Sequence, residues 1–393
     1  MSRKGRRRWA APPGSDLGHF RPYEVGSIQP VATAVTDTWY TPPPPVRRQL
    51  LAVVAALVAA ACAADETPPS YPARGLPPDT TKLPLTDLGA GTYRGFRGGL
   101  YPNGSNAVPS AHAALGTTFA RSIRPLSSAG QPDANGKIVF LSVGMSNVTQ
   151  EFCGGGPTTC QSFSFIGQAL ADASFNRARV VIVDGAQGGK VIPDWDQVTD
   201  ATYTTVRDTR LAALGVTEAQ VQAVWLKQAT PGPTVSLPAA NADAYTITAG
   251  LGTLVRTLKV RYPNLQIVFL SSRIYAGYAQ SGTLNPEPFA YETGFAVKWL
   301  IEAQIQQGAN GTPDARAGDL RPGVAAPWLA WGPYLWANGT TPRSDGLTYL
   351  PSDFATDNTH PGTGARQKVG AMLLEFMKTS PYASCWFVSG RTC

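Results

Sequence analysis

The sequence predicts a three-layer α/β/α sandwich with a central parallel sheet. Nearly continuous apolar runs of strand length recur along the chain, as parallel strands covered on both faces require. These runs occur at residues 137–143, 178–184, 221–226 and 265–270. Segments with helical spacing alternate with them, at residues 163–174, 204–214, 241–261, 290–306 and 363–378. Strand–helix alternation with crossovers of this length predicts a parallel sheet with helices on both faces.

The composition agrees with a large folded domain. The chain has 393 residues, of which 43% are apolar, enough for one large α/β domain with additional segments. Its formal net charge of +7 comes mainly from residues 1–48, which hold eight of the 33 Lys and Arg residues but three of the 26 Asp and Glu residues. Because the remainder is nearly neutral and shows no basic patch with interleaved aromatic residues, the sequence argues against nucleic-acid binding.

Residues 46–62 have the pattern of an export signal. Arg47 and Arg48 precede a short Ala/Val/Leu run that ends in small residues and Cys62. The run is shorter than the roughly 20 residues that span a bilayer, so we expect a secretory signal. Its end, Ala-Ala-Ala-Cys, resembles a bacterial lipobox, which predicts lipidation of Cys62. An N-terminal anchor helix and a cleaved, non-lipidated signal are the alternatives.

A signal is expected at the start of a chain, yet residues 1–45 precede this one. These residues show neither helical nor strand periodicity. We hypothesise that translation begins at Val46 and that residues 1–45 are not translated. The alternative is a genuine disordered cytoplasmic leader.

The rest of the chain divides by composition. Residues 63–82 are rich in Pro, Thr, Asp and Gly, which predicts a flexible tether. Residues 83–136 are Gly-rich with few apolar runs, and we expect an irregular segment packed on the main domain. The main domain is expected at residues 137–393.

Besides Cys62, four cysteines form two local pairs in the sequence. Cys153 lies close to Cys160, and Cys385 close to Cys393. Disulfides within these pairs agree with export, because disulfides persist in oxidising compartments. No histidine lies near either pair, which argues against a zinc site. We expect no metal and no organic cofactor.

Two polar segments far apart in the sequence contain the parts of a nucleophilic site. Ser146 follows the strand expected at 137–143 and precedes a turn, so the strand end would display its hydroxyl. His360 lies three residues after Asp357, just before the helix expected at 363–378. A serine hydroxyl needs a base to take its proton, and an imidazole held by a carboxylate is such a base. The alternatives are a structural turn serine and a hydrogen-bonded structural histidine.

Four segments in chain order resemble the SGNH-hydrolase superfamily, and within it the sialate O-acetylesterase-like carbohydrate esterases. That group typically has Gly-Gln-Ser-Asn after the first strand, Gly-Gly followed by an apolar residue and Trp after the second, Trp-x-Gln-Gly-Glu after the third, and Asp-x-x-His-Pro near the end. The matching segments are Gly144–Asn147, Gly185–Trp195, Trp225–Ala229 and Asp357–Pro361. Met145 stands where glutamine is usual, and Lys227-Gln228-Ala229 replaces the glycine-glutamate continuation.

The resemblance implies a flavodoxin-like SGNH-hydrolase fold and an ester hydrolase without a cofactor. By this resemblance Ser146 attacks the ester carbonyl, His360 shuttles the proton and Asp357 orients the imidazole. The oxyanion is held by the backbone N–H of Ser146, by that of Gly188 or Gly189, and by the Gln228 side chain.

Ligands of parallel sheets bind outside the carboxyl ends of the strands. Residues that follow the expected strand ends are therefore candidate substrate contacts: Gln187, Gly189, Trp195, Arg273 and Tyr275. His112, in the irregular segment, could also line the cleft. Trp328, Trp331, Tyr334 and Trp336 crowd one stretch and could form a carbohydrate platform. We favour a buried cluster, because aromatic residues more often belong to a core.

These patterns together predict a serine esterase that removes acyl groups, acetyl in the first instance, from carbohydrate. We expect it to be exported, and either lipid-anchored at the bacterial cell envelope or secreted. Its expected partner is an acylated carbohydrate, and a lipid anchor is its expected contact with the membrane. One alternative is a general GDSL-type lipase or acyl esterase, which would favour long-chain esters. Another is a non-catalytic carbohydrate-binding surface lipoprotein on a hydrolase scaffold.

Overall fold

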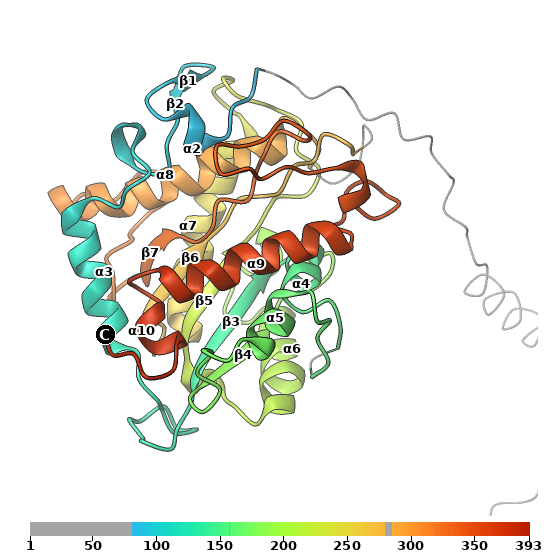
Figure 1. The fold of residues 1–393 in the computed structure, drawn as a ribbon. Coiled ribbons are helices and arrows are strands. Elements are labelled where there is room, and N and C mark those ends of the chain that lie inside the picture. The colour runs from blue at the N-terminus through green and yellow to red at the C-terminus, as the bar shows by residue number, and fades with distance from the viewer. Residues whose placement is uncertain (1–80, 157, 280–284) are drawn as a thin grey trace, which may run out of the picture. The chain divides into compact units, whose positions relative to one another are not determined.

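A computed structural model describes residues 81–393, except residue 157 and residues 280–284 (Figure 1). The expected export signal, the lipidation at Cys62 and the translation start at Val46 lie outside the described residues. Among the helices of the described residues, none has the length and apolar character needed to cross a membrane.

Five strands form the central sheet, in the order β4-β3-β5-β6-β7, and every neighbouring pair is parallel. Their bounds are β3 Ile138–Gly144, β4 Val180–Asp184, β5 Val221–Lys227, β6 Ile267–Leu270 and β7 Trp328–Trp331. Counted along the chain, this is the 2-1-3-4-5 order of flavodoxin-like sheets. The predicted fold class, a parallel sheet between layers of helices, is confirmed.

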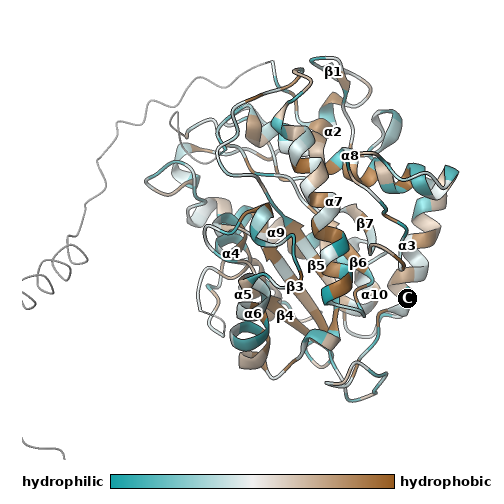
Figure 2. Ribbon diagram, turned by 180° about the vertical axis from the view of Figure 1, so that it is seen from behind, coloured by the Kyte–Doolittle hydropathy of each residue, from teal (hydrophilic) through white to brown (hydrophobic). Residues whose placement is uncertain are grey.

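Burial explains the composition of the strands. Every residue of β3, β5, β6 and β7 is buried, because helices or loops cover both faces of the sheet. Figure 2 shows these strands as mostly hydrophobic. The four expected strands are all present, but β7 was not expected. Its four residues lie in the aromatic stretch, where two tryptophans dominate a run too short to show a strand pattern.

The helices form two layers (Figure 1 and Figure 2). On one side of the sheet, α4 (Ser146–Phe152), α5 (Phe165–Ala171) and α9 (Thr363–Thr379) pack against one another. On the other side, α7 (Asp243–Arg261) packs against α8 (Phe289–Asn310). After β4, α6 (Ala201–Thr205) continues through a π-helical segment, Val206–Leu211, and a 3-10 turn, Ala212–Leu214. All five expected helices are present, and α4 is an additional one.

Short elements complete the described chain. The 3-10 turns are Pro102–Gly104, Ile192–Asp194, Glu218–Gln220 and Pro351–Asp353. Helix α10 (Ser384–Phe387) follows α9 near the C-terminus. Before the sheet, α2 (Leu85–Leu88) leads into a small hairpin of β1 (Thr92–Tyr93) and β2 (Phe96–Arg97).

The segment at residues 83–136, expected to be irregular chain packed on the main domain, contains regular structure. Residues Ser110–Ser122 form the 13-residue helix α3, which contacts β6 and β7. The glycines suggested irregular chain, yet Gly116 lies on this helix. A side chain at Gly116 would overlap the Trp328 indole, so glycine is there for close packing.

Candidate active site

Ser146 is the first residue of helix α4, and Met145 alone separates it from the end of β3. The structure therefore has a strand-to-helix junction where a turn was expected. Gly144 makes this junction narrow, because a side chain there would overlap the Lys227 carbonyl and the Val148 side chain. As the first N–H of the helix, the Ser146 amide has no carbonyl of the helix to bind. The hydroxyl and the backbone N–H of Ser146 thus lie together at the carboxyl end of the sheet.

His360 is held by a tight loop between the 3-10 turn Pro351–Asp353 and helix α9. The backbone N–H groups of Thr359 and His360 both donate to Asp357 Oδ1, each at 2.9 Å. Asn358 occupies the left-handed region with φ +54°, which asparagine tolerates better than most residues. The backbone N–H of Ala355 donates to the His360 carbonyl at 2.9 Å and closes the loop. The loop's own backbone therefore sets the angle between carboxylate and imidazole.

The two segments meet at hydrogen-bond distance. Ser146 Oγ lies 2.8 Å from His360 Nε2, and His360 Nδ1 lies 2.5 Å from Asp357 Oδ2. Partial burial works to raise the pKa of the Asp357 carboxyl, but the hydrogen bonds from His360 and Thr359 outweigh it and leave this pKa below its ordinary value. An ionised Asp357 accepts a hydrogen bond from the Nδ1–H group and leaves Nε2 free to accept the serine proton. The arrangement is chemically capable of activating a serine hydroxyl.

Asn147 joins the two segments, and the sequence did not single it out. Its side chain is buried, and Nδ2 points to the Thr359 carbonyl at 3.5 Å. This contact links the start of α4 to the residue before His360. The feature of the sequence that could have pointed to Asn147 is its position directly after Ser146.

The expected oxyanion donors lie on adjacent strand ends. The backbone N–H of Gln187 donates to the Gly144 carbonyl at 3.0 Å, which brings the exposed Gly188 next to the end of β3. Gln228 directly follows Lys227, the partner of Gly144 in the sheet. Its Nε2 donates to the Lys190 carbonyl at 3.3 Å. Since an amide carries two N–H donors, one remains for a ligand.

A buried ion pair lies behind Ser146. Glu151 of α4 pairs with Lys227 of β5, and neither side chain has exposed surface. Burial raises the pKa of Glu151, and burial lowers the pKa of Lys227 to about 8, each partner opposing the other's shift. Arg273 is buried within electrostatic range of Glu151, and burial lowers its pKa to about 10. The pair fastens the helix that begins at Ser146 to the neighbouring strand.

Three expected substrate contacts are wrong in this structure, because their side chains turn into the core. Trp195 is 0% exposed, Arg273 2% and Tyr275 3%. The Trp195 ring packs edge-on against Tyr203, and Tyr275 packs edge-on against Tyr278. A position after a strand end places a residue at the correct edge of the sheet, but it does not determine which way the side chain points.

Gln187 and Gly189 differ from these three. Gln187 is half-buried, and its Nε2 donates to the Thr202 carbonyl at 2.9 Å. Gly189 is exposed, with φ +73° and open space where a side chain would be. Both stay candidates for substrate contact.

His112 has a structural role away from Ser146. Its Nε2 lies 2.8 Å from the Leu329 carbonyl, and its ring packs 5.0 Å from that of Trp328. Burial lowers its pKa, which favours the neutral ring. The favoured interpretation of the aromatic stretch is confirmed, because all four of its rings are buried: Trp328, Trp331, Tyr334 and Trp336.

Both expected disulfides are formed, between Cys153 and Cys160 and between Cys385 and Cys393. Cys153 directly follows helix α4, so the first bridge secures the end of the helix that begins at Ser146. Within the described residues, no group of three or more His, Cys, Asp or Glu side chains is placed to hold a metal ion.

No protein-family model matches the chain, and no curated protein matches it. Several solved structures are distantly similar. A carbohydrate esterase family 2 enzyme with a carbohydrate-binding domain, from Corynascus thermopiles (Myceliophthora fergusii), is 12% identical, with a TM-score of 0.33 over 62% of this chain and 66% of that one. A psychrotrophic esterase from Pseudoalteromonas sp. is 11% identical, with a TM-score of 0.32 over 61% of this chain and 96% of that one. An extracellular lipase from Streptomyces rimosus is 13% identical, with a TM-score of 0.30 over 61% of this chain and 98% of that one. The interpretation of the site rests on its own geometry.

Proposed function

We propose that this chain is a serine esterase that removes acyl groups, acetyl in the first instance, from carbohydrate. The observation that carries the proposal is the continuous contact from Ser146 Oγ to His360 Nε2, at 2.8 Å, and from His360 Nδ1 to Asp357 Oδ2, at 2.5 Å. A serine or histidine with a purely structural role does not require a hydroxyl, an imidazole and a carboxylate to be hydrogen-bonded in this order.

The proposed reaction has two steps. Ser146 Oγ attacks the ester carbonyl carbon while its proton passes to His360 Nε2, and the leaving alcohol then takes that proton as the C–O bond breaks. Water next attacks the carbonyl carbon of the acyl-serine and gives a proton to Nε2. The imidazolium then passes this proton to Ser146 Oγ as the acyl C–O bond breaks and the carboxylic acid leaves. Asp357 stays ionised throughout and stabilises the imidazolium that forms in each step.

The negative charge that develops on the carbonyl oxygen needs preorganised donors. In the proposal these are the backbone N–H groups of Ser146 and Gly188 and the second N–H of Gln228. Removing one such donor typically raises the barrier by roughly 2.7–4 kcal/mol. The narrow junction at Gly144 supports this assignment, because it holds the first of these donors close to the strand ends that carry the other two.

The carbohydrate part of the proposal is supported by the motif resemblance to sialate O-acetylesterase-like esterases. The sequence of residues 46–62 supports export and a lipid anchor at Cys62. Mass spectrometry of the protein from its native host tests the proposed export and lipidation. A lipid-modified Cys62 at the mature N-terminus is expected, and any peptide from residues 1–45 would contradict a translation start at Val46.

The test of the reaction compares wild type, Ser146→Ala and Asp357→Asn on p-nitrophenyl acetate and on a panel of acetylated glycans. Ser146→Ala is expected to abolish acetate release. Asp357→Asn is expected to lower kcat by about 10²- to 10⁴-fold with little change in KM, because the amide favours the wrong imidazole tautomer. Ser122→Ala, at an exposed serine at the end of helix α3, serves as the matched control.

The outcomes separate the competing functions. Equal activity of wild type and Ser146→Ala would end the serine mechanism. Preference for long-chain p-nitrophenyl esters over acetylated glycans would favour a general lipase. A wild-type protein inert on every ester would favour a non-catalytic binding protein.

A further inference from the structure

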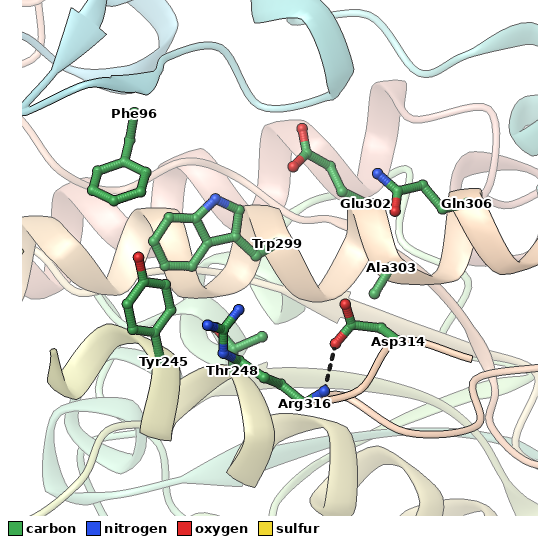
Figure 3. Close-up of a pocket in the computed structure, with 9 residues that line it drawn as sticks. All are labelled: Phe96, Tyr245, Thr248, Trp299, Glu302, Ala303, Gln306, Asp314 and Arg316. Atoms are coloured by element: carbon green, nitrogen blue, oxygen red, sulfur yellow. Dashed lines mark hydrogen bonds between the residues drawn. The ribbon is translucent and has the colours of Figure 1, made fainter. Parts of the chain in front are cut away.

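A pocket lies away from Ser146, between helices α7 and α8 and the loop that follows α8 (Figure 3). Its cavity has a volume of about 260 Å³, and its walls include none of Ser146, His360 or Asp357. Helices α7 and α8 cover the face of the sheet opposite to α9, which the His360 loop precedes (Figure 1). A ligand here would not be the one whose bond is cleaved.

Aromatic rings form one wall of this pocket. Tyr245 of α7 stacks on Trp299 of α8 with ring centroids 5.0 Å apart, and Phe96 of β2 packs edge-on against the same indole at 5.3 Å. The Arg316 guanidinium lies 4.2 Å from the centroid of the Tyr245 ring. Since these rings come from three distant segments, packing fixes their positions, and the wall is preformed.

Polar groups without partners surround the cavity. In the described part of the chain, no hydrogen bond joins another residue to the Tyr245 hydroxyl, the Trp299 indole N–H, the Gln306 amide or the Arg316 guanidinium. Asp314 uses Oδ1 to accept the backbone N–H groups of Arg316 and Ala317, both at 2.8 Å, and its Oδ2 stays available. Figure 3 shows Asp314 on the loop, across the cavity from Glu302 and Gln306 of α8.

This set of groups selects one chemical class of ligand. An acyl chain would make no hydrogen bond to these four donor groups or to the Asp314 carboxylate, and it would displace water that solvates them. An anion would meet the Asp314 carboxylate and the Glu302 carboxylate, which is paired with Lys298, and the lining offers it a single guanidinium, that of Arg316. Neutral sugars combine C–H faces that pack on rings with hydroxyls that both donate and accept. We infer that the pocket binds one unit of a neutral saccharide chain.

The inference goes beyond the proposed esterase, because the pocket's lining supports it independently of the chemistry at Ser146. Small-molecule pockets usually measure about 300–1,000 Å³, so a cavity of this size suits a single sugar unit. Its role would be to hold a glycan on the enzyme's surface while a different part of the same chain, or of a neighbouring one, reaches the sheet edge.

Calorimetry with xylohexaose, cellohexaose and mannohexaose tests the inference on the full chain carrying Ser146→Ala, so that hydrolysis cannot interfere. At least one hexasaccharide is expected to bind. Tyr245→Phe keeps the ring stack and removes one hydroxyl, and Gln306→Ala removes an exposed amide. Each is expected to weaken binding about five- to tenfold, the value of one hydrogen bond. Gln131→Ala, an exposed glutamine elsewhere, is the matched control and should bind like the parent.

Binding that both pocket variants leave unchanged would overturn the inference, and so would the failure of all three hexasaccharides to bind at millimolar concentration. Both substitutions are conservative, and thermal unfolding by circular dichroism checks that the variants fold. Ester hydrolysis is measured separately, in the same pocket variants with Ser146 intact. A protein that binds hexasaccharides but hydrolyses no ester would refute the esterase and leave the pocket assignment standing.

Discussion

Asp184 is a buried carboxyl group beneath the helix that begins at Ser146. It accepts hydrogen bonds from the Ser142 hydroxyl at 2.7 Å, from the Thr149 hydroxyl at 2.5 Å and from the Ala186 backbone N–H at 3.3 Å. Despite these bonds, burial raises its pKa to about 6, because the charged form loses its hydration. Asp184, which accepts a hydrogen bond from Thr149 of α4, therefore changes its charge near pH 6.

The shift has a defined consequence for stability. The unfolded aspartate has a pKa of about 3.9, and the folded one binds its proton more tightly. The stabilising contribution of Asp184 is therefore fully present below about pH 4 and is lost as the pH rises through about 6. Asp184→Asn lacks this titration.

We therefore expect the stability advantage of wild type over Asp184→Asn to shrink by about 1 kcal/mol between pH 5 and pH 7.5. Urea unfolding of both proteins at the two pH values measures it. Because the difference between the two proteins cancels every other titrating group, a constant gap across this range would show that Asp184 does not titrate there. Asp208→Asn, a fully exposed aspartate, should give a gap independent of pH.

Single residues also show what the sequence could and could not supply. Ser146 and His360 could be predicted because few polar residues with this chemistry follow strand ends, and because the Asp357 spacing lets one loop hold both carboxylate and base. Arg273 was misplaced, since its neighbours decide whether it faces solvent or Glu151. The contact of Asn147 with Thr359 joins two distant segments, and no local pattern could reveal it.

At the scale of elements, helix α4 depends on a buried charge. Glu151 faces two buried cations: Lys227, its ion-pair partner, and Arg273, whose Nε and Nη2 have no partner among the described residues. Loss of Glu151 leaves both cations buried without that anion. Loss of Lys227 leaves Glu151 with Arg273 still near. The two single substitutions should therefore differ in cost.

We expect Glu151→Gln to lower the free energy of unfolding by about 3–5 kcal/mol and Lys227→Met by less. The double variant Glu151→Leu, Lys227→Met should recover part of the loss, because an apolar pair of similar volume needs no desolvation of charge. Chemical unfolding of the three proteins provides the measurement. Single variants of equal stability would refute the role given to Arg273. A double variant no more stable than Glu151→Gln would refute the buried-charge argument itself.

The helices and strands also show which parts of the fold could be predicted from the sequence. Strands β3 to β6 could be predicted because burial on both faces demands continuous apolar residues. The helix α4 could not, since Ser146–Phe152 is short and carries Ser, Asn and Thr, which compete with helical hydrogen bonds. What forms it is its position between β3, α9 and the Lys227 ion pair, which only the folded chain provides.

At the scale of the whole molecule, the segment before the sheet is fastened to α8. Lys298 is 3% exposed, and its Nζ donates to the backbone carbonyls of Gly98, Gly99 and Tyr101 at 2.6, 3.3 and 3.2 Å. Tyr93 adds a stacked contact with Phe295 of the same helix at 5.8 Å. The glycine-rich composition predicted irregular chain here, and one ammonium group supplies the bonds that regular structure would otherwise provide.

Replacing this lysine tests how the segment is held. Lys298→Met keeps the aliphatic stem but leaves three carbonyls without their charged donor, so we expect a loss of about 2–4 kcal/mol in unfolding free energy. Amide hydrogen exchange should rise in residues 92–105 while β3 and β5 stay protected, because the sheet does not depend on this contact. Lys259→Met is the matched control, since Lys259 Nζ also donates to two carbonyls, of Pro263 and Leu265, but outside the segment. If both variants raised exchange in residues 92–105 equally, or neither did, Lys298 would not be the group that secures the segment to α8.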